Sequence, residues 1–253
     1  MPADTCNRAN MLHAPELVLP PPFTLVTLRE VGDAFAHAAS IAAEQGAGTL
    51  VYVGRFDLAE FAVVLEPEEP LAKARRAFYA GMSALADTLT SHAQPETAVH
   101  IDWPDALSIN RGLVGGGRLG WPRGAREDET PPWLVFGAMI RTVSMSGVEP
   151  GLHPFSTALE EEGFTDVLAS QLVESFARHF MVALDAWQEQ GFDAVAKDYL
   201  RRLPLEKGVR RDIDDNGDLL LRRVGKAAVE RKKLTPLLVT PSWLDPQMRG
   251  PQL

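Results

Sequence analysis

The chain has 253 residues, of which 45% are hydrophobic and 23% charged, and its formal net charge is -9. This composition is typical of a globular protein, and the acidic balance argues against nucleic-acid binding, which needs clustered positive charge. The single cysteine, Cys6, excludes an internal disulfide. The sequence also has no apolar run of about 18 residues and no secretory signal pattern. Together with the single cysteine, these features favour a cytoplasmic protein that does not contact membranes.

The N-terminal part of the chain alternates short strands with amphipathic helices. Four prolines between residues 15 and 22 predict an extended arm over residues 1–22. Apolar periodicity then predicts strands at 23–28, 49–53 and 59–65, and helices at 29–44 and from Pro70 to about residue 91. Only Gly54-Arg55-Phe56-Asp57 joins the second strand to the third.

The segment from 100 to 119 forms the centre of the pattern. Two short strands, 98–101 and 107–109, flank a Trp103-Pro104-Asp105 corner, and an Asn110-Arg111-Gly112 turn follows. The next extended run carries three consecutive glycines, 115–117. Glycine weakens a strand, so this run indicates that something packs directly on the backbone. We favour a ligand there over a packed helix.

The C-terminal part continues with a polar loop at 124–130 and a strand at 133–145. A break at 147–154 precedes helices at 165–190 and 192–203. A hairpin is expected at 209–223, turning at Asp214-Asp215-Asn216-Gly217, and the tail reads as an apolar stretch at 237–239 followed by proline-rich coil. These elements predict an α+β fold with a mixed, mostly antiparallel sheet packed by helices and a small C-terminal β-appendage. We divide the chain into an arm (1–22), a main domain (23–204) and an appendage with tail (205–253).

Several motifs in this order resemble the catalytic domain of biotin and lipoate protein ligases. Trp103-Pro104, followed ten residues later by Leu113-Val114-Gly115-Gly116, matches the family's K-W-P-N-D and K-V-G-G motifs without a gap. Residues 133–140 resemble a later family strand that ends in G-x-G-I-N, and residues 158–203 resemble its last helices. The resemblance covers about 23–223. It implies the biotin/lipoate ligase-like fold, with biotin, lipoate or ATP as candidate ligands and a biotinyl or lipoyl carrier domain as candidate partner.

The chain departs from the family pattern at the positions that carry catalysis. Leu113 stands where the family has the lysine that balances the charge of the forming acyl-adenylate. Asp105 and Ala106 stand where the family has Asn and Asp, and Gly54-Arg55 is all that remains of its glycine- and arginine-rich adenylate loop. The G-x-G-I-N pattern reads Gly137-Ala138-Met139-Ile140-Arg141. The combined changes argue against the usual ATP-dependent ligation.

No catalytic residue is therefore assigned, and no histidine spacing suggests a metal site. The candidate ligand-binding residues are Arg55, Trp103, Asp105, Gly115, Gly116, Gly117 and Arg118. Trp103 is also explained as a core residue, Asp105 as a turn cap, and each arginine as a solvated surface group.

Three functions follow as hypotheses. The leading one is a divergent family member that binds a biotin- or lipoyl-type carboxylate, or its carrier domain, without standard ligation. The second is an active ligase or acyltransferase in which Arg118 or Arg111 replaces the lysine. The third is a regulatory or interaction protein without a small ligand, which a space filled by Leu113 and Met139 would favour.

Overall fold

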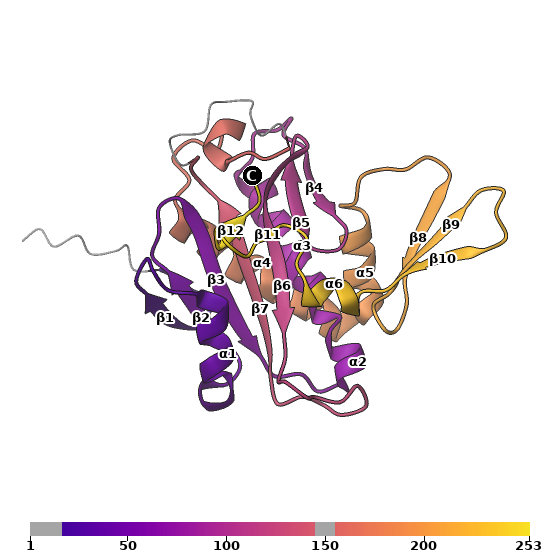
Figure 1. The fold of residues 1–253 in the computed structure, drawn as a ribbon, viewed down its shortest axis with the longest axis horizontal. Coiled ribbons are helices and arrows are strands. Elements are labelled where there is room, and N and C mark those ends of the chain that lie inside the picture. Colours follow the sequence, from indigo (N-terminus) through magenta and orange to yellow (C-terminus); the bar gives the residue numbers. More distant parts are fainter. Residues whose placement is uncertain (1–16, 145–154) are drawn as a thin grey trace, which may run out of the picture.

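The computed structural model describes residues 17–144 and 155–253, and its centre is one seven-stranded sheet (Figure 1). The strand order is β1-β2-β3-β7-β6-β5-β4. β1 and β2 pair in parallel, and the other neighbouring pairs are antiparallel, which confirms the predicted mixed, mostly antiparallel sheet. The strands are β1 (Thr24–Leu28), β2 (Thr49–Val53), β3 (Leu58–Leu65), β4 (Val99–Asp102), β5 (Ala106–Ile109), β6 (Gly112–Gly120) and β7 (Leu134–Arg141).

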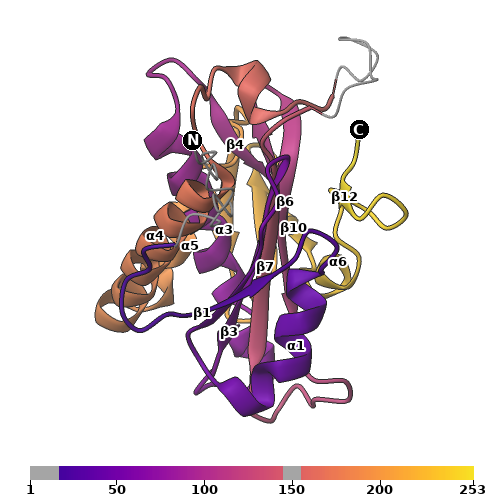
Figure 2. The ribbon, with the colours of Figure 1, turned by 90° about the vertical axis from the view of Figure 1, so that its left-hand side faces the viewer.

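Helices α3 (Ala77–His92) and α4 (Ala169–Gln190) cover one face of the sheet, and α5 (Phe192–Leu200) packs against both (Figure 2). Alternate residues of each strand point to this face. The rings of Phe61 and Phe176 lie 4.6 Å apart between centroids, and Phe136 stacks on Phe176 at 5.7 Å. These aromatic contacts form the centre of the main core.

Helix α1 (Ala34–Gln45) covers β2, β3 and β7 on the opposite face. Alanines face the sheet at positions 34, 38 and 42, so the helix axis can approach the strands closely. Asp33 caps the helix by accepting a hydrogen bond from the Ala36 N–H at 2.9 Å. The helix ends at Gly46, whose φ is 75°.

The tail covers β6 and β7 on this opposite face. It comprises α6 (Thr235–Val239), β11 (Leu244–Asp245) and β12 (Gly250–Pro251), of which the last two pair with each other (Figure 2). The residues after 239 are mostly irregular, as expected, but they fold against the sheet and bury Trp243 completely.

The appendage contains the predicted hairpin, β8 (Val209–Ile213) and β9 (Leu219–Arg223), turning at the expected Asp214–Gly217 segment. The Asp214 carboxylate accepts the N–H groups of Asn216 and Asp218 at 3.0 and 2.9 Å, which fixes the turn. A third strand, β10 (Val229–Lys232), pairs with β9 and was not predicted, because its four residues are all exposed and show no apolar alternation.

The remaining differences concern element boundaries. The helix expected from Pro70 to residue 91 is divided into α2 (Leu71–Ala74) and α3, with the break at the buried Arg75 and Arg76. β7 ends at Arg141 and α4 begins at Ala169, both inside the expected ranges, and a short 3-10 helix occupies Leu159–Glu162. The expectations for Cys6 and for 147–154 lie outside the described residues, as does most of the 1–22 arm. No helix of the described ranges has both the length and the apolar composition needed to cross a membrane.

Candidate functional site

The protein itself occupies the space above all three glycines of the 115–117 run. At the first glycine, an added Cβ would lie 1.9 Å from the carbonyl oxygen of Met139 on the neighbouring strand. At the second it would lie 2.1 Å from the Asp105 carbonyl oxygen and 2.4 Å from Cδ1 of Trp243, and at the third 2.6 Å from Sδ of Met82. The close approach that the glycines predict is therefore made by a strand, by the tail and by α3.

Asp105 anchors the tail at the corner that precedes β5. Its carboxylate accepts hydrogen bonds from the Ser242 N–H at 2.8 Å and from the Ser242 hydroxyl at 2.6 Å. Next in the chain, Trp243 donates from its indole Nε1 to the Gly117 carbonyl at 2.9 Å. Burial raises the pKa of Asp105, and the two hydrogen bonds from Ser242 offset part of that rise.

Leu113 lies in an apolar cluster with the tail rather than in a charged pocket. It packs against a cluster formed by Leu58, Ala106, Met139 and Trp243. An ammonium at this position would have to be desolvated among apolar side chains. Leu113 and Met139 thus fill the space beside the glycine run. This arrangement favours the third hypothesis, a regulatory or interaction protein without a small ligand.

Arg141 holds the other end of the tail. Its guanidinium donates to the carbonyl oxygens of Pro251 at 2.5 Å and Gln252 at 3.2 Å, and also to the Ser156 hydroxyl. Three of the positions that the sequence analysis singled out, Asp105, Leu113 and Arg141, thus contact the tail or the cluster around it.

A group of charged side chains lies beside the tail, at the N-terminus of α1. Arg118 donates to Asp33 at 3.2 Å, and its guanidinium stacks 4.1 Å from the centroid of Phe35. Arg55 makes a two-point ion pair with Asp57, at 3.0 and 2.6 Å. Burial lowers the pKa of Arg118, and Asp33 partly counters the shift.

Glu60 is the buried member of this group, with 3% of its surface exposed. Its carboxylate accepts the Ala34 N–H at 2.9 Å, so it binds the positive end of α1 from the sheet below. Burial raises the pKa of Glu60, and the nearby Asp33 raises it further, while the hydrogen bond from the Ala34 N–H and the charges of Arg55 and Arg118 oppose the change.

This raised pKa predicts a pH-dependent effect of Glu60→Gln, which keeps an acceptor for the Ala34 N–H. Above the ordinary pKa of 4.5, the native protein holds the Glu60 proton more tightly than the unfolded chain does. Stability from this group is therefore full below pH 4.5 and declines as pH rises through the native pKa. Urea unfolding at several pH values should show the wild-type advantage over Glu60→Gln shrinking with rising pH. The exposed Glu96→Gln is the control, and an advantage that grows with pH contradicts the assignment.

A cavity of about 380 Å³ opens beside Arg118, between α1, β6 and the tail. Its walls are largely apolar and include the side chains of Phe35, Trp121, Leu238, Val239, Pro241 and Leu244. Among the described residues, Arg118 is the one charged side chain that lines it. This open cavity therefore combines largely apolar walls with a single cation.

The structure brings some of the sequence candidates together and separates others. Arg55 and Arg118 both lie close enough to Glu60 to influence its pKa. Trp103 packs in the main core on the helical side, where Tyr199 donates to the neighbouring Pro104 carbonyl at 2.7 Å. Arg111 is exposed in the turn before β6 and lies about 20 Å along that strand from Arg118.

Sequence reasoning missed Asp33, Glu60, Ser242 and Trp243. Glu60 gave a signal, because it is the one charged residue within the buried strand LAEFAVVL. Trp243 gave a weaker one, as a large aromatic residue in a segment rich in proline and polar residues. Ser242 had none, because its partner lies 137 positions away.

The arrangement of sheet, helices and hairpin is that of biotin protein ligases. An apo structure of the biotin protein ligase from Aquifex aeolicus matches with a TM-score of 0.65 at 13% identity, covering 84% of this chain and 97% of that one. The same enzyme in complex with biotin and ATP matches with a TM-score of 0.59 at 13% identity, over 83% and 99%. These likenesses establish the fold, and the predicted fold is confirmed.

The chain belongs to the biotin/lipoate A/B protein ligase family, whose model matches residues 19–201. It is also 30% identical to a biotin protein ligase-like protein of unknown function from Silicibacter sp. TM1040. That structure matches with a TM-score of 0.73, over 88% of this chain and 98% of the other. No curated protein matches the sequence. The resemblance read from the sequence motifs is thus confirmed.

Proposed function

We propose that the protein binds a small, largely apolar carboxylic acid of the biotin or lipoyl type in the cavity beside Arg118 and does not adenylate it. The observation that carries the proposal is the single guanidinium in an otherwise apolar cavity. Arg118 makes one side-chain hydrogen bond within the described residues, to Asp33, although a guanidinium has five donors. It therefore keeps donors for the two oxygens of a carboxylate, free or on a carrier domain.

Two features support the loss of ligation. The space over Gly116 belongs to Trp243, and the place of the family lysine is part of an apolar cluster. The backbone N–H groups of Gly54 and Arg55 are already bonded to the carbonyls of Leu28 and Val53, at 3.2 and 2.9 Å. Phosphate stabilisation needs fixed donors around the developing charge, and this short connection offers few.

Titration calorimetry with octanoate, lipoate and biotin tests the proposal. At least one acid should bind with 1:1 stoichiometry, and octanamide, which lacks the charge, should bind more weakly. Arg118→Gln should weaken acid binding about tenfold or more, because a hydrogen bond to a charged group contributes about 1.5–3 kcal/mol. The matched control is Arg111→Gln, at the exposed turn, which should bind like the parent.

The alternatives predict different results. Acid-dependent exchange of pyrophosphate into ATP that disappears in Arg118→Gln would establish the active ligase instead. A regulatory or interaction protein is favoured by the filled space around Leu113 and Met139. No heat with any acid, together with no binding of a lipoyl or biotinyl carrier domain, would establish that function and refute ours.

A further inference from the structure

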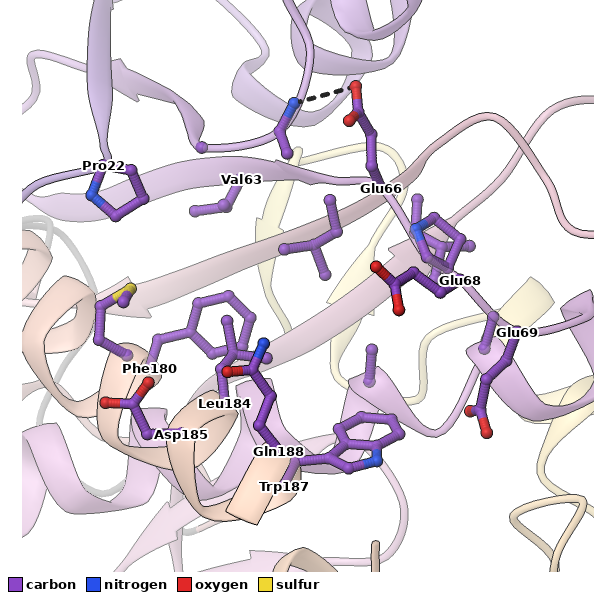
Figure 3. A pocket seen from close by; sticks show the side chains of 18 of the residues that line it. Pro22, Val63, Glu66, Glu68, Glu69, Phe180, Leu184, Asp185, Trp187 and Gln188 are labelled. Atoms are coloured by element: carbon purple, nitrogen blue, oxygen red, sulfur yellow. Dashed lines mark hydrogen bonds between the residues drawn. The ribbon is translucent and has the colours of Figure 1, made fainter. Parts of the chain in front are cut away.

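A second cavity, of about 430 Å³, lies on the opposite, helical face of the sheet (Figure 3). It opens between the C-terminal half of α4 and the segment that follows β3. Val63 and Leu65 point to this side, whereas Glu60 faces α1, so the cavity is separate from the one beside Arg118. Its volume falls in the range of small-molecule sites.

The floor of this cavity is apolar. The fully buried side chains of Val63, Leu134 and Phe180 form its base, and the half-buried Leu184 and Trp187 form the wall on α4. Figure 3 shows the ring of Phe180 and the indole of Trp187 bordering the same space. Covering this floor with the apolar part of a ligand would remove it from water, which favours binding.

The rim of the cavity is acidic. Glu66, Glu68 and Glu69 follow β3 along one side, and Asp185 stands on α4 at the other (Figure 3). Glu69 is neutralised by Arg76, at 2.8 Å, and Glu66 accepts the Ala47 N–H at 3.3 Å.

The other two rim carboxylates, Glu68 and Asp185, are exposed and make no side-chain hydrogen bond or ion pair within the described residues. No lysine or arginine of the described ranges lines the cavity. An apolar floor under uncompensated negative charge is complementary to an organic cation and repels an anion.

We propose that this cavity binds a small organic cation, a primary ammonium on an apolar body. The ammonium would lie at the rim, between Glu68 and Asp185, and the apolar body would cover Phe180 and Leu184. The ligand class is thus opposite in charge to the acid proposed for the cavity beside Arg118, and the two sites are independent.

Three indole probes of nearly equal size test the charge requirement by calorimetry on the full chain. Tryptamine carries the ammonium, tryptophol carries a hydroxyl in its place, and indole-3-propionate carries a carboxylate. Tryptamine should bind with 1:1 stoichiometry, about fivefold or more tightly than tryptophol. Indole-3-propionate belongs to the acid class proposed for the other cavity, so it is titrated into Arg118→Gln, where it should not bind. Affinity for tryptamine should fall with added NaCl, as for exposed ion pairs.

Two variants locate the site. Glu68→Gln/Asp185→Asn should weaken tryptamine about fivefold and leave tryptophol unchanged, since each exposed ion pair contributes modestly. Gln188→Lys, which places a competing ammonium on the same rim, should weaken tryptamine further. The control Glu96→Gln/Asp215→Asn removes the same charge at exposed positions elsewhere and should bind like the parent. All these positions are exposed, and thermal melting checks that each variant is folded.

Three results would overturn the proposal. These are the absence of tryptamine binding at millimolar concentration, equal affinity for tryptamine and tryptophol, and tryptamine binding that neither variant weakens. An effect of Arg118→Gln on tryptamine would show that the probe occupies the other cavity, and would also refute this assignment.

Discussion

Replacing Trp243 by alanine is expected to lower the free energy of unfolding by about 3–5 kcal/mol, the usual cost of emptying a fully buried aromatic site. The indole is completely buried and donates to the Gly117 carbonyl at 2.9 Å. It also packs on Gly116, Met139 and Ala106. Its loss leaves a cavity directly on the sheet, and denaturant unfolding of the two proteins measures the difference.

The control for this change is Val239→Ala, in the same tail. Val239 is 69% exposed, so its truncation should change stability by less than about 0.5 kcal/mol. Equal and small effects of both substitutions would mean that the tail does not pack on the sheet. Trp243 would then not fill the space over Gly116.

Gly115→Ala is expected to destabilise the protein by about 3 kcal/mol, at the upper end of the range for added volume in a packed core. The new Cβ would lie 1.9 Å from the Met139 carbonyl oxygen, and that oxygen belongs to the backbone of β7. Because the obstacle is a backbone atom, no change of side-chain rotamer can relieve the overlap. Strands β6 and β7 would therefore have to separate locally.

Gly117→Ala is the matched comparison, two residues along the same strand. There the added Cβ would lie 2.6 Å from the thioether sulfur of Met82 and 2.9 Å from the ring of the buried Phe136. Both are side chains rather than backbone, and the methionine can change rotamer. We expect a loss of about 1 kcal/mol by thermal or denaturant unfolding. A larger loss for Gly117→Ala than for Gly115→Ala would contradict this explanation of the glycine run.

The framework of this fold follows from local patterns in the sequence. The alternation that sends Phe61 and Val63 to one face of β3, and the helical spacing of Leu172, Phe176 and Phe180 on α4, are visible without coordinates. The same holds for the 100–119 hairpin, whose Trp103-Pro104 corner and glycine run are one of several motifs that together indicated the family. Such patterns predict which elements form and which faces are buried, because both depend on neighbours along the chain.

The packing of Trp243 over Gly116 could not be predicted in the same way. Trp243 bonds to a carbonyl 126 positions earlier, and no periodic pattern in the tail indicates that contact. Leu113 and Arg141 were singled out from the sequence, but their contacts with the tail were not visible there. Both residues are explained only when the tail is placed over the sheet, where an ammonium at 113 would be desolvated and Arg141 can bind Pro251.

The proposal that this protein does not adenylate an acid is tested most directly by acid-dependent exchange of pyrophosphate into ATP. The exchange is measured for the natural protein and for Leu113→Lys. With octanoate, lipoate or biotin in excess, we expect no exchange from either protein. Restoring the lysine should also destabilise the fold, because the charge has no partner in the cluster of Met139 and Trp243. Clear acid-dependent exchange by the natural protein, or its recovery in Leu113→Lys, would contradict the account and show that the phosphate site is intact.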